Sequence, residues 1–143
     1  MTRTRWIVVL VAVGVGLAIL IGVLGTRNQP SKTEAVSSLC GSLKTLGSDV
    51  KVLTGLDPST ASMTDFDDDV ASIQTDWNQV QSDAKAVQNA PTGDLDSAWN
   101  SFATAVGSVS SSASVSDALN TVSQSAQQLV SAAQSTASQL SCS

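Results

Sequence analysis

The sequence predicts an all-α protein in which one N-terminal transmembrane helix is followed by an antiparallel up-down-up-down four-helix bundle closed by a disulfide. Three features of the 143-residue chain predict it: an uncharged apolar run near the N-terminus, four later segments whose apolar residues recur every three or four positions, and two cysteines near the ends of the later part. No window of comparable length alternates between apolar and polar residues as a half-buried strand does. The part after the apolar run is therefore expected to be helical.

The apolar run covers residues 6–24 and contains no charged residue. At about 1.5 Å per residue, a helix of this length crosses the hydrocarbon core of a bilayer, which is about 30 Å thick. Arg3 and Arg5 precede the run and Trp6 lies at its edge, which favours a cytoplasmic N-terminus. We therefore expect a single-pass cell-membrane protein. Its parts are a cytoplasmic tail (residues 1–5), a transmembrane signal-anchor helix (6–25), a linker (26–32) and an extracytoplasmic helical domain (33–143).

Two further interpretations concern the same run. It is also compatible with a cleaved signal peptide, with Val23 and Gly25 as the small residues of the cleavage site, which would make the protein secreted. Gly14, Ala18 and Gly22 lie four residues apart on one face of the helix, a pattern that allows two spanning helices to approach closely. The oligomeric state stays open. Residues 26–143 are exported whether the apolar run is a membrane anchor or a cleaved signal peptide.

The helical stripes of the exported part lie in residues 33–56, 64–90, 94–109 and 115–140. Gly55 is expected to end the first of these helices. Capping signals open the second and the fourth, at Thr64-x-x-Asp67 and Ser114-x-x-Asp117. Residues 107–114 (GSVSSSAS) are expected to form a loop, because glycine and serine are weak helix formers. The alternative is one continuous helix over residues 94–140.

Cys40 and Cys142 favour four helices over three. An even number of cysteines in an exported segment predicts a disulfide, and bonded cysteines have Cα atoms within about 7 Å of each other. Three helices would leave Cys142 at the opposite pole from Cys40, whereas a fourth helix returns it. With each helix pair aligned from its own turn, Ala84 lies level with Trp99 and Cys142 lies several residues past Cys40. We therefore expect a bent or frayed end at Cys142.

Composition excludes several kinds of partner and chemistry. Residues 26–143 hold all twelve acidic residues and five of the seven basic ones, which gives a net charge of −7. This charge disfavours DNA, RNA and anionic lipid as partners, because each presents phosphate. Histidine is absent, which excludes His-assisted nucleophilic catalysis and His-containing zinc sites. We expect no catalytic residue, no metal ion and no cofactor.

Aspartates are densest near the predicted start of the second helix, at the membrane-distal tip of the bundle. This acidic tip consists of Asp57, Asp65, Asp67, Asp68 and Asp69. Its spacing is similar to the start of a calcium loop, but Val70 and Asp76 occupy the positions where such a loop needs glycine and glutamate. Carboxylates in the first turn of a helix are already favoured by its dipole. The alternative is a site for a cation or a basic partner.

Trp77 and Trp99 are the largest side chains of the exported part. Both lie on the apolar stripes of their helices, so core packing explains them better than a ligand pocket does.

Four short motifs carry a resemblance. They are Leu39-Cys40-x-x-Leu43, Leu56-Asp57-Pro58, Asp76-Trp77 and the ending Ser141-Cys142-Ser143. Together with the N-terminal anchor and the Ser/Ala/Gln-rich last segment, they make the chain similar to a group of small exported or membrane-anchored Ser/Ala-rich helical proteins of actinobacteria. The resemblance implies a helical fold and an extracytoplasmic location, and it implies no activity.

Two functions of different classes remain. The first is a non-enzymatic, membrane-anchored extracytoplasmic domain that contacts an envelope protein through its surface. The second is a bundle that holds a small apolar ligand between its helices. The stripes contain many alanines and few polar residues that could orient a ligand, which favours the first.

Overall fold

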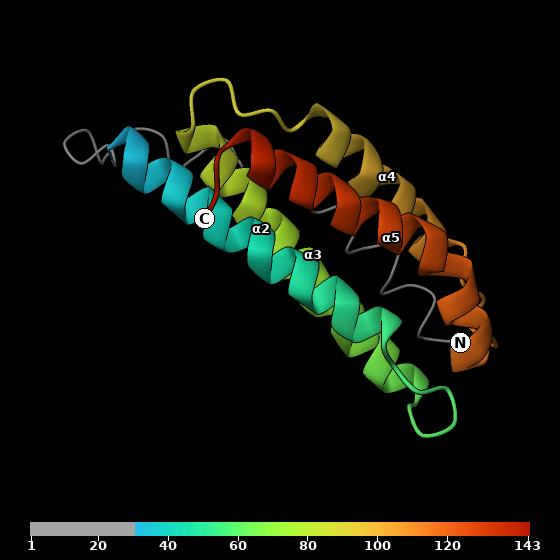
Figure 1. Ribbon diagram of the computed structural model, residues 1–143. Helices are drawn as coiled ribbons and strands as arrows, with labels where there is room; N and C mark the ends of the chain where they lie inside the picture. Colours follow the sequence, from blue (N-terminus) through green and yellow to red (C-terminus); the bar gives the residue numbers. More distant parts are fainter. Residues whose placement is uncertain (1–30) are drawn as a thin grey trace, which may run out of the picture.

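The computed structural model describes residues 31–143, which form four α-helices: α2 (Lys32–Thr54), α3 (Met63–Ala86), α4 (Gly93–Gly107) and α5 (Val115–Gln139) (Figure 1). The expected spanning helix, its contact face at Gly14, Ala18 and Gly22, and most of the expected linker lie outside the described residues. Among residues 31–143, no helix is both long and apolar enough to cross a membrane.

Serine side chains fix where three of the helices begin. Ser31 and Ser62 form capping boxes with Glu34 and Asp65, and the Ser114 side chain accepts from the backbone N–H of Asp117. The predicted start of α5 is confirmed. The predicted capping box at Thr64 is wrong, because Ser62 caps α3 two residues earlier and leaves Thr64 inside the helix.

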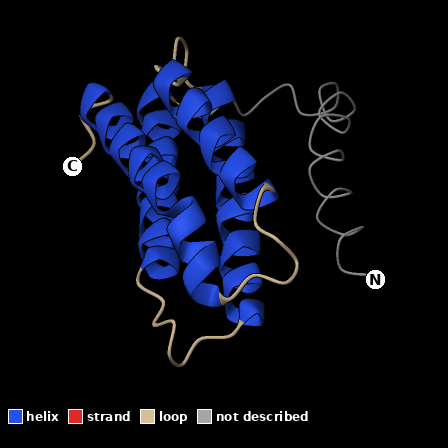
Figure 2. Ribbon diagram, turned by 90° about the vertical axis from the view of Figure 1, so that its right-hand side faces the viewer, coloured by secondary structure: helices blue, strands red, loops and turns tan. Residues whose placement is uncertain are grey.

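The helices pack side by side with alternating direction (Figures 1 and 2). α2 packs against both α3 and α5, and α5 also packs against α4. The core is built from the apolar stripes that the sequence shows, including Leu39, Leu46, Ile73, Phe102 and Leu129, which are all buried. At roughly 25 cal/mol per Å² of apolar surface, this burial is the main force that holds the helices together.

Trp77 and Trp99 join α3 to α4. Trp77 is buried in the core and Trp99 is half-buried against it, and the two rings stack with centroids 4.9 Å apart. Core packing is therefore confirmed for both. The structure shows this stack instead of the expected pairing of Trp99 with Ala84, which lies two turns further along α3. The connection after α3 is no tight turn, and Figure 1 shows it running along the bundle before α4 begins.

The loop between α4 and α5 is confirmed. α4 ends at Gly107 and α5 begins at Val115, so the serine-rich stretch separates two helices that run in opposite directions. The predicted four-helix arrangement is confirmed, and the alternative of a continuous helix over residues 94–140 is wrong.

The disulfide between Cys40 and Cys142 is present, with Cα atoms 5.6 Å apart and a sequence separation of 102. The expected bend at this end takes the form of a Schellman turn. Ser141 adopts a left-handed conformation (φ 57°). The backbone N–H of Cys142 donates to the carbonyl of Ala137 at 2.9 Å, and that of Ser141 donates to Ser138 at 3.0 Å. This turn ends α5 and directs Cys142 back toward α2.

Candidate functional site

Polar side chains line the outer edge of the contact between α2 and α3. On α3 they include Asp69, Asp76 and Asp83, which are seven residues apart and therefore share one face of the helix. On α2 they include Ser42 and Asp49, also seven residues apart. We call these five residues the α2–α3 seam.

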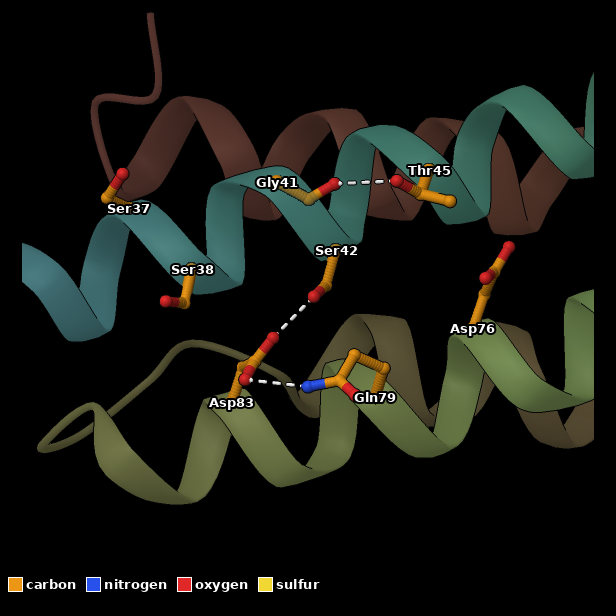
Figure 3. A pocket seen from close by; sticks show the side chains of 8 residues that line it. All are labelled: Ser37, Ser38, Gly41, Ser42, Thr45, Asp76, Gln79 and Asp83. Carbon is orange, nitrogen blue, oxygen red and sulfur yellow. Dashed lines mark hydrogen bonds between the residues drawn. The ribbon is translucent and has the colours of Figure 1, made fainter.

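The first layer of the seam is the pair Ser42 and Asp83. The Ser42 hydroxyl donates to Asp83 Oδ2, and Gln79 Nε2 donates to Asp83 Oδ1 at 3.0 Å (Figure 3). Both oxygens of the Asp83 carboxylate therefore have a hydrogen-bond donor. This is the arrangement that a half-buried carboxylate needs.

The second layer of the seam is the pair Asp49 and Asp76. Because α2 and α3 are antiparallel, a step of seven residues forward from Ser42 and seven back from Asp83 leads to Asp49 opposite Asp76. An aspartate on α2 here replaces the serine of the first layer. Two ionised carboxylates have only acceptors to offer each other.

The Asp76 carboxyl is held in an unfavourable environment for its charge. Its Oδ2 atom is buried and has no donor within residues 31–143. Burial raises the pKa of Asp76 to about 6, and a hydrogen bond with Asp49 and the negative charge of Asp49 act in the same direction. The Asp76 Oδ2 atom lacks a donor. Two carboxyls can form a hydrogen bond with each other only when one of them carries a proton, so the bond between Asp76 and Asp49 requires a protonated carboxyl.

Asp69 extends the same pattern toward the distal end. Its Oδ2 atom is also buried without a donor in the part of the chain that the structure describes. Burial raises the pKa of Asp69, and the charges of Asp49, Asp65 and Asp68 raise it further.

A surface groove of about 430 Å³ opens along the part of the seam nearer the disulfide (Figure 3). Its lining side chains are hydroxyls, an amide and carboxylates, with one glycine: Ser37, Ser38, Gly41, Ser42, Thr45, Asp76, Gln79 and Asp83. Figure 3 shows Asp76 pointing from α3 toward α2. None of these lining residues is basic. We call this feature the α2–α3 groove.

The acidic tip is divided by the fold. Asp57 accepts from the backbone N–H and the hydroxyl of Ser59, which lowers the pKa of Asp57. Asp65 accepts from the backbone N–H and the hydroxyl of Ser62, which lowers the pKa of Asp65.

The other three aspartates of the acidic tip differ in their location. Asp67 and Asp68 are exposed, whereas Asp69 lies in the α2–α3 seam. Within residues 31–143, no group of three or more acidic, histidine or cysteine side chains could hold a metal ion. A role of the tip in binding a basic partner stays a prediction.

A second groove, of about 510 Å³, lies between α4 and α5. Its lining is mostly serine and glutamine, including Ser97, Ser101, Gln124 and Gln128, and its one charged residue is Asp94. It offers neither the apolar wall nor the concentrated charge of a specific site.

From the sequence we expected no role for Asp49, and Asp76 entered only as a calcium-loop position and as part of the Asp76-Trp77 motif. The seven-residue spacing of the three α3 aspartates shows that they share one face of the helix. The sequence does not show which residues of α2 lie opposite that face.

Comparison with known proteins adds no assignment. No protein-family model matches the chain, and no curated protein or solved structure is significantly similar to it.

Proposed function

We propose that the protein is a non-enzymatic, membrane-tethered extracytoplasmic module that contacts an envelope protein through its surface. The contact site is the α2–α3 groove, and the matching element of the partner is a segment that carries lysine or arginine. The observation that supports this best is a groove with two carboxylates, several hydroxyls and no basic lining residue.

The chemistry of the groove fits a cationic group. Ammonium and guanidinium groups donate several hydrogen bonds, and carboxylates accept the strongest of them. The net charge of −7 over residues 26–143 attracts basic segments and repels phosphate-bearing polymers.

An enzyme is the weaker interpretation. Two carboxyls that share a proton occur in acid–base catalysis, but Asp49 does not line the groove and Asp76 Oδ2 is buried. The Ser42 hydroxyl is bonded to a carboxylate, which is a weak base for activating a serine, and the chain contains no histidine.

A small apolar ligand also receives less support. Such a ligand needs a concave wall of aliphatic and aromatic side chains. The two grooves described above are lined mainly by polar side chains. The aromatic residues Phe66, Trp77 and Phe102 are buried in the core, where they contact other parts of the bundle.

The proposal is tested by photocrosslinking of the full-length protein in cells. A photoreactive residue at exposed Ser38 reports on the α2–α3 groove, and one at Gln128 reports on the other groove. We expect one envelope protein to be crosslinked from Ser38 and not from Gln128. Crosslinking of the same protein from both positions, or of lipid alone, would contradict the proposal.

A matched pair of blocking variants sharpens this test. A Cβ added at Gly41 or at Gly47 meets nothing within 4 Å, so both helical positions accept a side chain. Gly41 lines the α2–α3 groove and Gly47 does not. Gly41→Met should abolish the crosslink from Ser38, whereas Gly47→Met should leave it unchanged.

A further inference from the structure

The two layers of the α2–α3 seam differ in one residue on α2. In the first layer a serine hydroxyl donates to the Asp83 carboxylate. In the second layer the equivalent position is Asp49, which has no proton to donate once it is ionised. Asp76 Oδ2 is left buried without a donor among residues 31–143. A proton is the smallest addition that converts the second layer into a hydrogen-bonded copy of the first.

We propose that Asp49 and Asp76 form a proton-operated latch, in which one carboxyl binds a proton, donates to the other, and fastens α2 to α3. When both carboxyls are ionised, the latch is open: the two charges repel each other across the interface, and the seam between the helices is weaker.

Within residues 31–143, no basic side chain acts on Asp76 in place of the proton. Asp69 and Asp83 lie two turns away on either side along α3, and both are acidic. The nearest basic residues of α2, Lys44 and Lys51, are exposed. Asp49 is the one titratable group that acts on Asp76. The acidic side chains of α4 and α5 lie outside the seam, with Asp94 in the other groove.

The direction of the pH effect follows from the raised pKa. Asp76 has a pKa of about 6 in the folded protein and the ordinary value of 3.8 when the chain is unfolded. The folded state therefore binds the proton more tightly, so stability rises as the pH falls from above 6 toward 4. This is opposite to the common behaviour of a paired aspartate. Asp57 and Asp65, whose pKa values are lowered, titrate below this window, whereas Asp69, whose pKa is also raised, acts in the same direction as Asp76.

The latch also changes the α2–α3 groove, because Asp76 lines it. An open latch adds one negative charge to the wall of the groove. If the groove takes a basic segment as proposed above, binding is tighter in neutral surroundings than in acidic ones. The latch itself does not depend on that function.

The test measures unfolding of the full-length protein in detergent micelles by urea at about pH 5 and about pH 8. The fluorescence of the stacked Trp77 and Trp99 reports unfolding, in a Trp6→Phe background. A shift of the Asp76 pKa from 3.8 to about 6 corresponds to an unfolding equilibrium constant about tenfold smaller at the lower pH. Because solvent screens a half-buried pair, we expect a decrease of roughly three- to fivefold.

Three variants distinguish the latch from other carboxylates. Asp49→Ser recreates the first layer and Asp76→Asn mimics the protonated carboxyl, so both should be more stable than the wild type at about pH 8. In both, most of the pH dependence should vanish. Asp83→Asn should keep it, because the Asp83 carboxylate already has its donors. Equal stability of the wild type at the two pH values, or full pH dependence in Asp49→Ser, would overturn the proposal.

Discussion

Thr136 shows how one hydroxyl can fix a connection between helices. The side chain is 1% exposed, near the end of α5, and its Oγ1 donates to the carbonyl of Pro91 at 3.3 Å. Pro91 belongs to the connection between α3 and α4, so this bond joins segments 45 residues apart. It helps to hold the connection in place where α4 begins.

Thr136→Val should therefore destabilise the protein by about 1 kcal/mol, because valine fills the same space and leaves the Pro91 carbonyl without its donor. Urea unfolding measures this. Thr121→Val is the matched control, since Thr121 is exposed and bonds only within its own helix, to Asp117. The control should change stability by less than about 0.5 kcal/mol. Equal losses in the two variants would show that the bond to Pro91 contributes nothing.

Some contacts between distant residues can be predicted from the sequence, and others cannot. The pairing of Cys40 with Cys142 was predictable, because two cysteines have one possible intramolecular partner each. The pairing of Asp49 with Asp76 was not, since it depends on which turn of α2 lies against which turn of α3. Apolar stripes show which face of a helix is buried and leave its position along the neighbouring helix open by a turn or more.

Helix ends show the same limit at the scale of an element. Ser114 with Asp117 was the only capping signal before α5, and the structure uses it. Before α3, Ser62-x-x-Asp65 and Thr64-x-x-Asp67 overlap by two residues. Serine is the better N-cap residue, and the start at Ser62 adds half a turn of helix.

Many serine hydroxyls of these helices donate to backbone carbonyls of the same helix. In α4, Ser97 donates to the carbonyl of Gly93 and Ser101 donates to that of Ser97, each at 3.1 Å. Such bonds add little stability. Packing of the apolar stripe therefore decides which serine-rich segments are helical, and residues 108–114 have too few apolar side chains to be included.

The break between α4 and α5 should be visible in hydrogen exchange. Backbone amides of residues 110–114 should exchange with solvent much faster than those of Phe102 and Leu129, which are buried in the core. Mass spectrometry of peptides from the exchanged protein measures this. Slow exchange throughout residues 107–115 would mean a continuous helix and would contradict the four-helix arrangement.

At the scale of the whole molecule, the disulfide closes residues 40–142 into a ring and joins α2 to the residues just after the end of α5. The ring spans 102 sequence positions, and on the chain-entropy model a cross-link of that length stabilises a protein by at most about 4–5 kcal/mol. A bundle with few aromatic residues depends strongly on such a term.

Replacing both Cys40 and Cys142 by serine should lower the urea midpoint substantially while helix content is retained, because the apolar stripes remain. Reduction of the wild type with a thiol should lower the midpoint by a similar amount. An unchanged midpoint in both experiments would show that the ring does not stabilise the fold.

We propose that the disulfide-closed bundle is tethered to a membrane and faces an oxidising compartment. This proposal is tested most directly by intact-mass spectrometry of the protein extracted from washed membranes without reductant. We expect one species with the mass of the whole chain, with or without Met1, less the two thiol hydrogens that the disulfide removes. A mature N-terminus near Thr26 recovered from the medium, or a full-length species with both thiols free, would contradict it.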